Sequence, residues 1–117
     1  MNQLEQLEAS IEAQKELIKF GDALDRLYEN KDFKTVILDD YFVQEASRLV
    51  LAKSEPTLRF EAHGEAQMKF LEDQLVGIGA LKQYLLAKTR QSDAARQGLE
   101  SSQELHSEML QEELNNG

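Results

Sequence analysis

The sequence predicts an all-α protein, a small bundle of three main helices with a long C-terminal helix projecting from the body. Apolar residues recur three and four positions apart over most of the chain, which is the spacing that places side chains on one face of a helix. The 117 residues include one proline and six glycines, too few turn formers for an all-β fold. Charged residues make up 30% of the chain, which favours long surface helices.

The first predicted helix runs from Leu4 to about Asn30. Its first apolar stripe consists of Leu4, Leu7 and Ile11. A second stripe with the same spacing but a shifted position follows it: Ala13, Leu17, Phe20, Leu24 and Leu27. A straight continuation of the first stripe would instead pass through Gln14, Ile18 and Gly21. The shift has two explanations: a helix whose ends pack against different neighbours, or the start of a coiled coil that joins a bundle.

The second predicted helix runs from Phe33 to Lys53 and is the most apolar part of the chain. We expect Asp32 to cap its N-terminus by accepting hydrogen bonds from first-turn backbone N–H groups. We also expect a kink or short break at Asp39-Asp40, because aspartate is a poor interior helix residue and a good cap.

The segment Ser54-Glu55-Pro56-Thr57 predicts the boundary before the third helix, because Pro56 disfavours the α conformation at Glu55. We expect the third helix to begin near Thr57 or Leu58. Gly77 and Gly79 would each cost about 1 kcal/mol in a helix interior relative to alanine. Glycines kept at such a cost indicate that another helix backbone approaches closely there; a hinge is the alternative explanation.

Beyond Lys88 the apolar pattern weakens, so the sequence predicts a helical body over residues 1–88 and an acidic tail over 89–117. The tail should be helical or partly disordered unless a partner covers its weak apolar stripe, which includes Leu105, Met109 and Leu110. Leu4, Leu7 and Ile11 should stay exposed on an N-terminal arm unless the chain self-associates. The predicted core is Leu17, Phe20, Leu24, Leu27, Phe33, Val36, Ile37, Tyr41, Phe42, Leu49, Val50, Leu71, Leu75, Ile78, Leu81 and Leu85.

The net charge of −9 is concentrated toward the chain ends. Residues 1–30 carry seven acids and three bases, and residues 98–117 carry five acids and no base. Such ends repel nucleic acid and anionic membrane, so we expect neither as a partner. The N-terminus lacks a signal peptide and no stretch is apolar enough to span a bilayer. These features predict a cytoplasmic or virion location without secretion by a signal peptide.

The chain offers little for catalysis, and we predict no enzyme, no cofactor and no metal site. It has no cysteine, which excludes thiol chemistry and thiolate ligands. A di-iron bundle needs a glutamate three residues before a histidine, but Phe60 and Gln103 precede His63 and His106. Asp39-Asp40 is better explained as a cap or kink than as a catalytic pair.

Two segments of the sequence resemble small uncharacterised helical proteins of tailed bacteriophages, encoded near virion-assembly genes. The first segment runs from Asp32 to Val50 and contains Glu45-Ala46-Ser47-Arg48-Leu49, similar to the Glu-Ala-x-Arg-Leu helix of those proteins. The second is Val76–Leu85, similar to their Ile-Gly/Arg-x-Leu-x-Gln-Tyr-Leu helix. Asp40 departs from the pattern, because the relatives often have a small turn residue there. The resemblance covers about residues 20–88 and implies a phage structural or accessory component.

These observations predict a protein-interaction module, with a phage structural or assembly accessory protein as the main hypothesis. It would oligomerise with itself or bind another phage protein. The predicted interaction residues are Leu4, Leu7, Ile11, Gly77, Gly79, Leu105, Met109 and Leu110. One alternative is an acidic inhibitor that binds a host protein, in defence evasion or host takeover. Another is a protein that holds a small anionic ligand near Lys82, Lys88 and Arg90.

Overall fold

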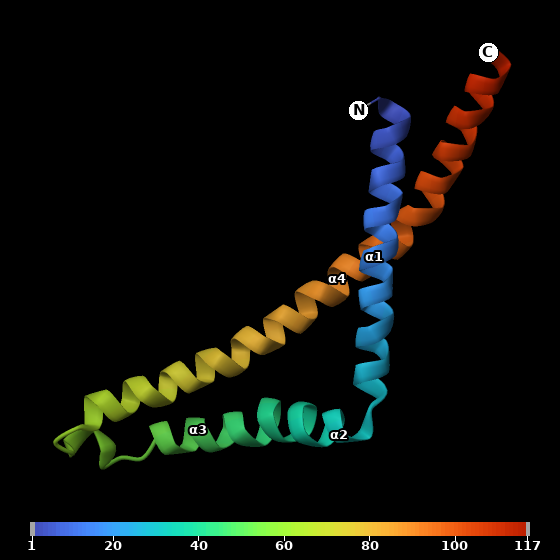
Figure 1. The fold of residues 1–117 in the computed structure, drawn as a ribbon. Coiled ribbons are helices and arrows are strands. Elements are labelled where there is room, and N and C mark those ends of the chain that lie inside the picture. Colours follow the sequence, from blue (N-terminus) through green and yellow to red (C-terminus); the bar gives the residue numbers. More distant parts are fainter. Residues whose placement is uncertain (1, 117) are drawn as a thin grey trace. The chain divides into compact units, whose positions relative to one another are not determined.

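The computed structural model describes residues 2–116, and every regular element in this range is helical (Figure 1). The predicted all-α class, with three main helices and a long C-terminal helix, is confirmed. In chain order the elements are α1 (Gln3–Glu29), α2 (Lys31–Phe33), the π-helix η1 (Lys34–Glu45), α3 (Ala46–Lys53), the 3₁₀ turn η2 (Leu58–Phe60) and α4 (Gly64–Asn116).

The chain divides into two compact units. Unit 1 combines the N-terminal segment up to Arg26 with the segment from Ala87 onward, and unit 2 comprises Leu27–Leu86. The division at Ala87 lies close to the body–tail boundary expected from the sequence. The segment beyond it, however, does not stand alone, because it forms one unit with α1.

In unit 1, α1 and the C-terminal part of α4 pack as an antiparallel pair. Glu8 contacts His106, and a Cβ atom on Gly21 would touch Ser92. Going along α1 from its N-terminus, the contacting residues of α4 have decreasing numbers, so the two helices run in opposite directions. The Asn2 side chain begins α1 by accepting a hydrogen bond of 2.8 Å from the Glu5 N–H, a standard N-terminal cap.

The buried face of α1 follows the straight continuation of its first stripe rather than the shifted stripe. Ile11, Gly21 and Leu24 are buried, and Gln14 and Ile18 are half-buried. The second stripe is a wrong prediction except at Leu24, because its large members are exposed: Leu17 at 36%, Phe20 at 42% and Leu27 at 39%. Each glycine at the interface leaves room for a side chain of the facing helix: Gly21 for Ser92, and Gly98 for the longer side chain of Gln14.

Unit 2 begins with a helix cap at Asn30, not at Asp32 as the sequence predicted. Asn30 has extended backbone angles and its side chain accepts a hydrogen bond of 2.9 Å from the Phe33 N–H. Asp32 lies two residues too late to do this, within α2. A T-shaped contact between the rings of Tyr28 and Phe33, at 5.6 Å, spans the same junction.

The π-helix η1 runs through Asp39-Asp40, so the kink or break expected there is absent. Its half-buried residues come as adjacent pairs four positions apart: Ile37-Leu38, Tyr41-Phe42 and, at the junction with α3, Glu45-Ala46. Such pairs share one face when the turn is wider than the 3.6 residues of an α-helix, although long π-helices are rare.

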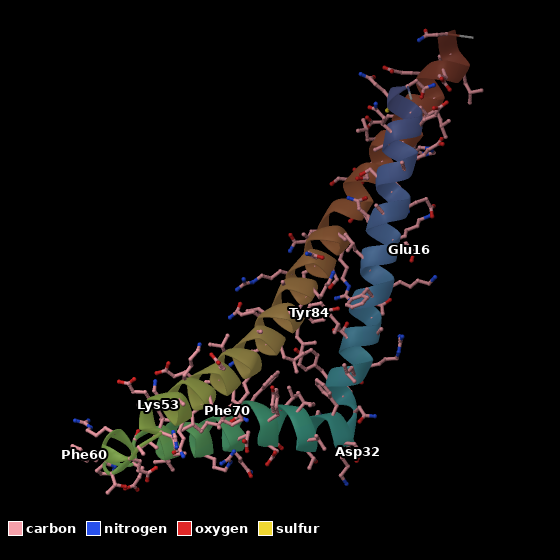
Figure 2. The ribbon with its side chains drawn as sticks, turned by 60° about the vertical axis from the view of Figure 1, so that its left-hand side comes forward. Glu16, Asp32, Lys53, Phe60, Phe70 and Tyr84 are labelled. Atoms are coloured by element: carbon pink, nitrogen blue, oxygen red, sulfur yellow. The ribbon has the colours of Figure 1, made fainter. Side chains whose placement is uncertain are left out.

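The connection from α3 to α4 is longer than expected, because α4 begins at Gly64 and not near Thr57 or Leu58. Leu58 is buried at the 3₁₀ turn, whereas Phe60 in the same turn is 83% exposed (Figure 2). A Cβ atom on Gly64 would lie 2.0 Å from the Leu58 carbonyl oxygen. Glycine at position 64 therefore lets the chain fold back over the turn before α4 starts.

The core of unit 2 is small. Leu49 is 1% exposed, and Leu58, Ile78 and Leu85 are also buried. Lys53 of α3 and Glu72 of α4 form an ion pair of 3.1 Å. Val36 of η1 and Val50 of α3 were predicted core residues, but they are 58% and 50% exposed, so both predictions are wrong.

Candidate interaction surface

The main hollow of unit 1 lies between the start of α1 and the end of α4. It is a groove of about 1050 Å³, which we call the end groove. It is lined by Asn2, Gln3, Leu4, Gln6, Leu7, Leu105, Met109, Glu112, Glu113 and Asn116. The groove therefore has apolar side chains from both helices and polar side chains around them.

The structure brings together two of the predicted interaction sets that are about a hundred residues apart in sequence. Leu4 and Leu7 come from the expected N-terminal arm, and Leu105 and Met109 come from the expected tail. Ile11, the third arm residue, is buried, with only 8% exposed. The expectation that the arm stays exposed without self-association is wrong, because α4 of the same chain covers it.

Leu110, which the sequence placed on the tail stripe, does not line the end groove, and neither does Leu114. Leu110 is 39% exposed and Leu114 is 82% exposed. Leu105 is 48% exposed although it lines the groove. The end groove is thus an incompletely covered apolar surface, since several leucines around it remain open to solvent.

Gly77 and Gly79 lie in the unit 2 part of α4 and are not close-approach points within the described chain. A Cβ atom on Gly77 would meet only the Tyr41 hydroxyl, at 4.0 Å, and one on Gly79 would meet no described atom within 4 Å. The close approaches are instead at Gly21, against Ser92, and at Gly98, against Gln14. Contact of Gly77 and Gly79 with another molecule stays a prediction.

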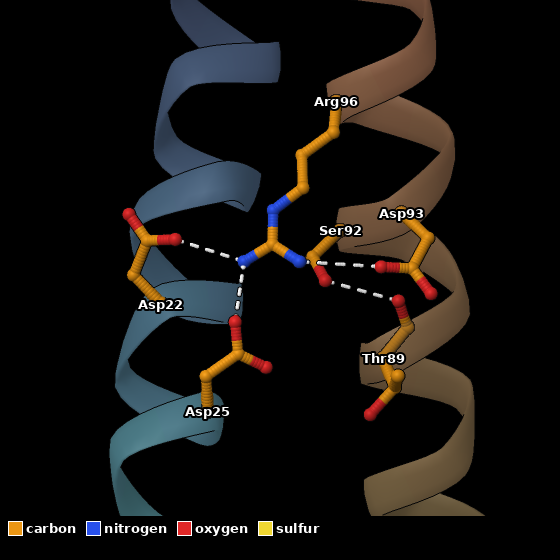
Figure 3. Close-up of polar contacts among 6 residues, drawn as sticks. All are labelled: Asp22, Asp25, Thr89, Ser92, Asp93 and Arg96. Carbon is orange, nitrogen blue, oxygen red and sulfur yellow. Dashed lines mark hydrogen bonds and ion pairs between the residues drawn. The ribbon is translucent and has the colours of Figure 1, made fainter.

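The middle of unit 1 is held by a polar cluster around Arg96 that the sequence analysis missed (Figure 3). One guanidinium nitrogen donates to Asp22 at 2.8 Å and to Asp25 at 2.9 Å, and another donates to Asp93 at 3.3 Å. Hydrogen bonds to Asp22 and Asp25 raise the pKa of Arg96 above its usual value. Three carboxylates of the same chain therefore surround the Arg96 guanidinium.

Buried polar side chains lie beside this cluster. Ser92 is 2% exposed, and its hydroxyl donates to the Thr89 carbonyl oxygen at 2.9 Å. The Gln14 side-chain oxygen is buried without a hydrogen-bond partner among the described residues. Polar groups inside a helix interface fix its register in some helix pairs. In the sequence, the only sign of these buried polar groups was that Gln14 lies on the straight continuation of the first apolar stripe; nothing marked Ser92.

Charges are paired in the middle of unit 1 but not around the end groove. Lys15 pairs with Glu12 and Lys19 with Glu16. Residues 2–12 and 100–116 contain eight acids, one histidine and no lysine or arginine. There the ion contact is between His106 Nε2 and Glu8 Oε1, at 3.2 Å. Apart from Glu12 and Glu8, the acids of these two segments have no ion-pair partner among the described residues, so unpaired carboxylates flank the end groove.

Neither a metal site nor a membrane span is found in the part of the chain that the structure describes. Over residues 2–116 no group of three or more histidine or carboxylate side chains is arranged to hold a metal ion. No described helix combines the length and apolar character needed to cross a bilayer. Comparisons with protein-family models, curated proteins and solved structures found no match to this chain.

Proposed function

We propose that this chain is a non-enzymatic protein-interaction module whose binding surface is the end groove. The observation that carries the proposal is the convergence of Leu4 and Leu7 with Leu105 and Met109 in one open groove. Apolar surface left open between two helices is the kind of site that takes a helix from another protein. The lining consists of apolar side chains, amides and two glutamates, with no serine, threonine, lysine or histidine among the described residues.

The biological setting that we propose is bacteriophage assembly, as a structural or accessory component. This part rests on the resemblance of Asp32–Val50 and Val76–Leu85 to small helical phage proteins. In this setting the module either oligomerises or binds a virion component. The exposed Gly77 and Gly79, and the open Phe70 and Val76 on the same helix, provide a second surface for such contacts.

Two measurements test this function together. Light scattering on a sizing column gives the solution mass, and mass spectrometry of virions purified from the encoding phage gives its copy number per particle. A defined multimer, or a fixed stoichiometry with one virion protein, supports the proposal. A monomer of 13.3 kDa that is absent from virions and from assembly intermediates would contradict the phage-assembly function.

A second candidate function is an acidic inhibitor of a host protein, used in defence evasion or host takeover. It is favoured by the tail glutamates Glu100, Glu104, Glu108 and Glu112, which recur every four residues along α4. Such a row can compete with nucleic acid for a basic surface. Retention of one host protein on the immobilised chain, reversed by added nucleic acid, would favour this function over the assembly function.

A further inference from the structure

We propose that the end groove takes a basic amphipathic helix of a different protein. This inference rests on the proposed interaction function and names the chemistry of its partner. Three observations support it: the apolar floor of the groove, the unpaired glutamates around it, and the charge repulsion that a second copy of the same acidic end would meet there.

The apolar floor sets the shape of the occupant. The groove is lined by Leu4 and Leu7 of α1 and, along α4, by residues from Leu105 to Asn116. These α4 positions extend over about 17 Å at 1.5 Å per residue, which matches about three turns of a bound helix. Such a helix would present apolar residues at positions i, i+3 or i+4, and i+7.

The unpaired glutamates set the charge of the occupant. Glu100, Glu104, Glu108 and Glu112 lie four residues apart, a spacing at which like charges on a helix repel one another and destabilise it. None of these four, nor Glu113, has an ion-pair partner among the described residues, whereas Lys15, Lys19 and Arg96 in the middle of the unit are paired. A shallow hollow of about 370 Å³ lies along the same row, lined by Glu100, Gln103, Glu104, Ser107 and Glu108.

A second copy of the chain is a poor occupant of this groove. Two such ends would bring eight acids against eight acids, and juxtaposed like charges oppose association. An anionic membrane or nucleic acid is repelled for the same reason. Lysine or arginine side chains on the rim of a bound helix would instead pair with Glu108, Glu112 and Glu113 beside the groove.

The test uses the full-length chain and three fluorescent synthetic peptides of about four turns, measured by anisotropy. The basic probe has leucines at i, i+3, i+4 and i+7 and lysines elsewhere. The scrambled probe has the same composition without the stripe, and the acidic probe has glutamates for lysines. We expect the basic probe to bind at least about tenfold more tightly than either other probe, with affinity falling as salt rises.

Matched variants locate the binding. Leu105→Gln should weaken the basic probe about tenfold, whereas Leu110→Gln, on the same helix with similar exposure but outside the groove lining, should not. Glu108→Gln with Glu112→Gln should weaken it, whereas Glu61→Gln with Glu65→Gln in unit 2 should not. Unchanged helicity by circular dichroism excludes unfolding as the cause.

Three results would overturn the inference. They are equal binding of the scrambled probe, equal effects of the groove and control variants, and a multimer that Leu105→Gln dissociates. The third result would place a second copy in the groove and leave the interaction function standing. If no probe binds and the chain neither multimerises nor enters virions, the proposed function fails together with the inference.

Discussion

Gly21 of α1 packs directly against the Ser92 side chain of α4. A Cβ atom on Gly21 would lie 2.4 Å from both the Cβ and the Oγ of Ser92. Glycine lowers intrinsic helix stability, so its presence here is explained by space and not by local preference. The sequence contained the signal, since Gly21 lies on the straight continuation of the Leu4–Leu7–Ile11 stripe, but a glycine does not resemble a core residue.

Two glycine substitutions test this close approach. Gly21→Ala should destabilise the protein by about 1–3 kcal/mol, because overpacking outweighs the gain in helix propensity. Gly79→Ala should stabilise it by up to about 1 kcal/mol, because a Cβ there meets open space. Urea unfolding monitored by circular dichroism measures both. Equal effects of the two changes would contradict the packing of unit 1.

Glu45 and Arg48 form a two-point contact at the junction of η1 and α3. Arg48 Nε donates to Glu45 Oε2 at 3.0 Å, and Arg48 Nη2 donates to the other oxygen. The hydrogen bond from Arg48 holds the pKa of Glu45 below its usual value of 4.5. A lowered folded-state pKa adds stability above the unfolded pKa, and this stability is lost as pH falls through the folded pKa.

An NMR titration of the glutamate side chains checks this contact. The pKa of Glu45 should lie below its usual value of 4.5, and Arg48→Gln should raise this pKa toward that value. The stabilising effect should be small, because the pair is solvent-exposed. A Glu45 titration that is unchanged by Arg48→Gln would contradict the ion pair.

Among the helical elements, the segment from Lys31 to Lys53 departs most from the sequence expectation. Its helical character was predicted, but its hydrogen-bond pattern was not, because a π-helix has no strong residue preference. The four-residue recurrence of Phe33, Ile37 and Tyr41 was the available signal. It was interpreted as an α-helical stripe that also included Val36 and Val50, which are exposed.

The start of this segment gives a prediction at the same scale. Asn30→Ala removes the side chain that accepts from the Phe33 N–H and should cost about 0.5–2 kcal/mol of stability. Asp32→Ala should cost less, because Asp32 lies inside α2 and not at the cap. Chemical unfolding measures the free energy of unfolding of both variants. A larger loss of stability for Asp32→Ala would show that Asp32 is the cap, as the sequence predicted.

For the whole chain, composition and apolar spacing predicted the fold class, the limits of α1 to within a residue or two and the boundary near Pro56. They did not predict that the tail would pair with α1. The tail stripe of Leu105 and Met109 is weak and surrounded by glutamates, so local pattern alone indicated a loose end. The pairing depends on contacts between residues about a hundred positions apart, for example Glu8 with His106, which periodicity within one helix does not reveal.

Removal of the tail therefore has an expected cost. Truncation after Arg96 exposes Ile11 and removes the helix against which the first half of α1 packs. The melting temperature should fall by more than about 4 °C, since a loss of 1 kcal/mol shifts a small domain by roughly that amount. Thermal unfolding by circular dichroism measures it. An unchanged melting temperature would show that the tail does not stabilise α1 and is an independent arm, as the sequence predicted.

The central claim is that the start of α1 and the end of α4 hold each other and so form the end groove. Hydrogen exchange with mass spectrometry tests this claim most directly. The measurement compares the wild type, the double variant Leu4→Gln with Leu7→Gln, and the control variant Leu51→Gln. The control replaces a residue of α3 that is 72% exposed. The account predicts faster amide exchange over residues 100–114 in the double variant only. Unchanged exchange over those residues in the double variant would show that the C-terminal end of α4 does not pack against α1. That result would contradict the existence of the end groove.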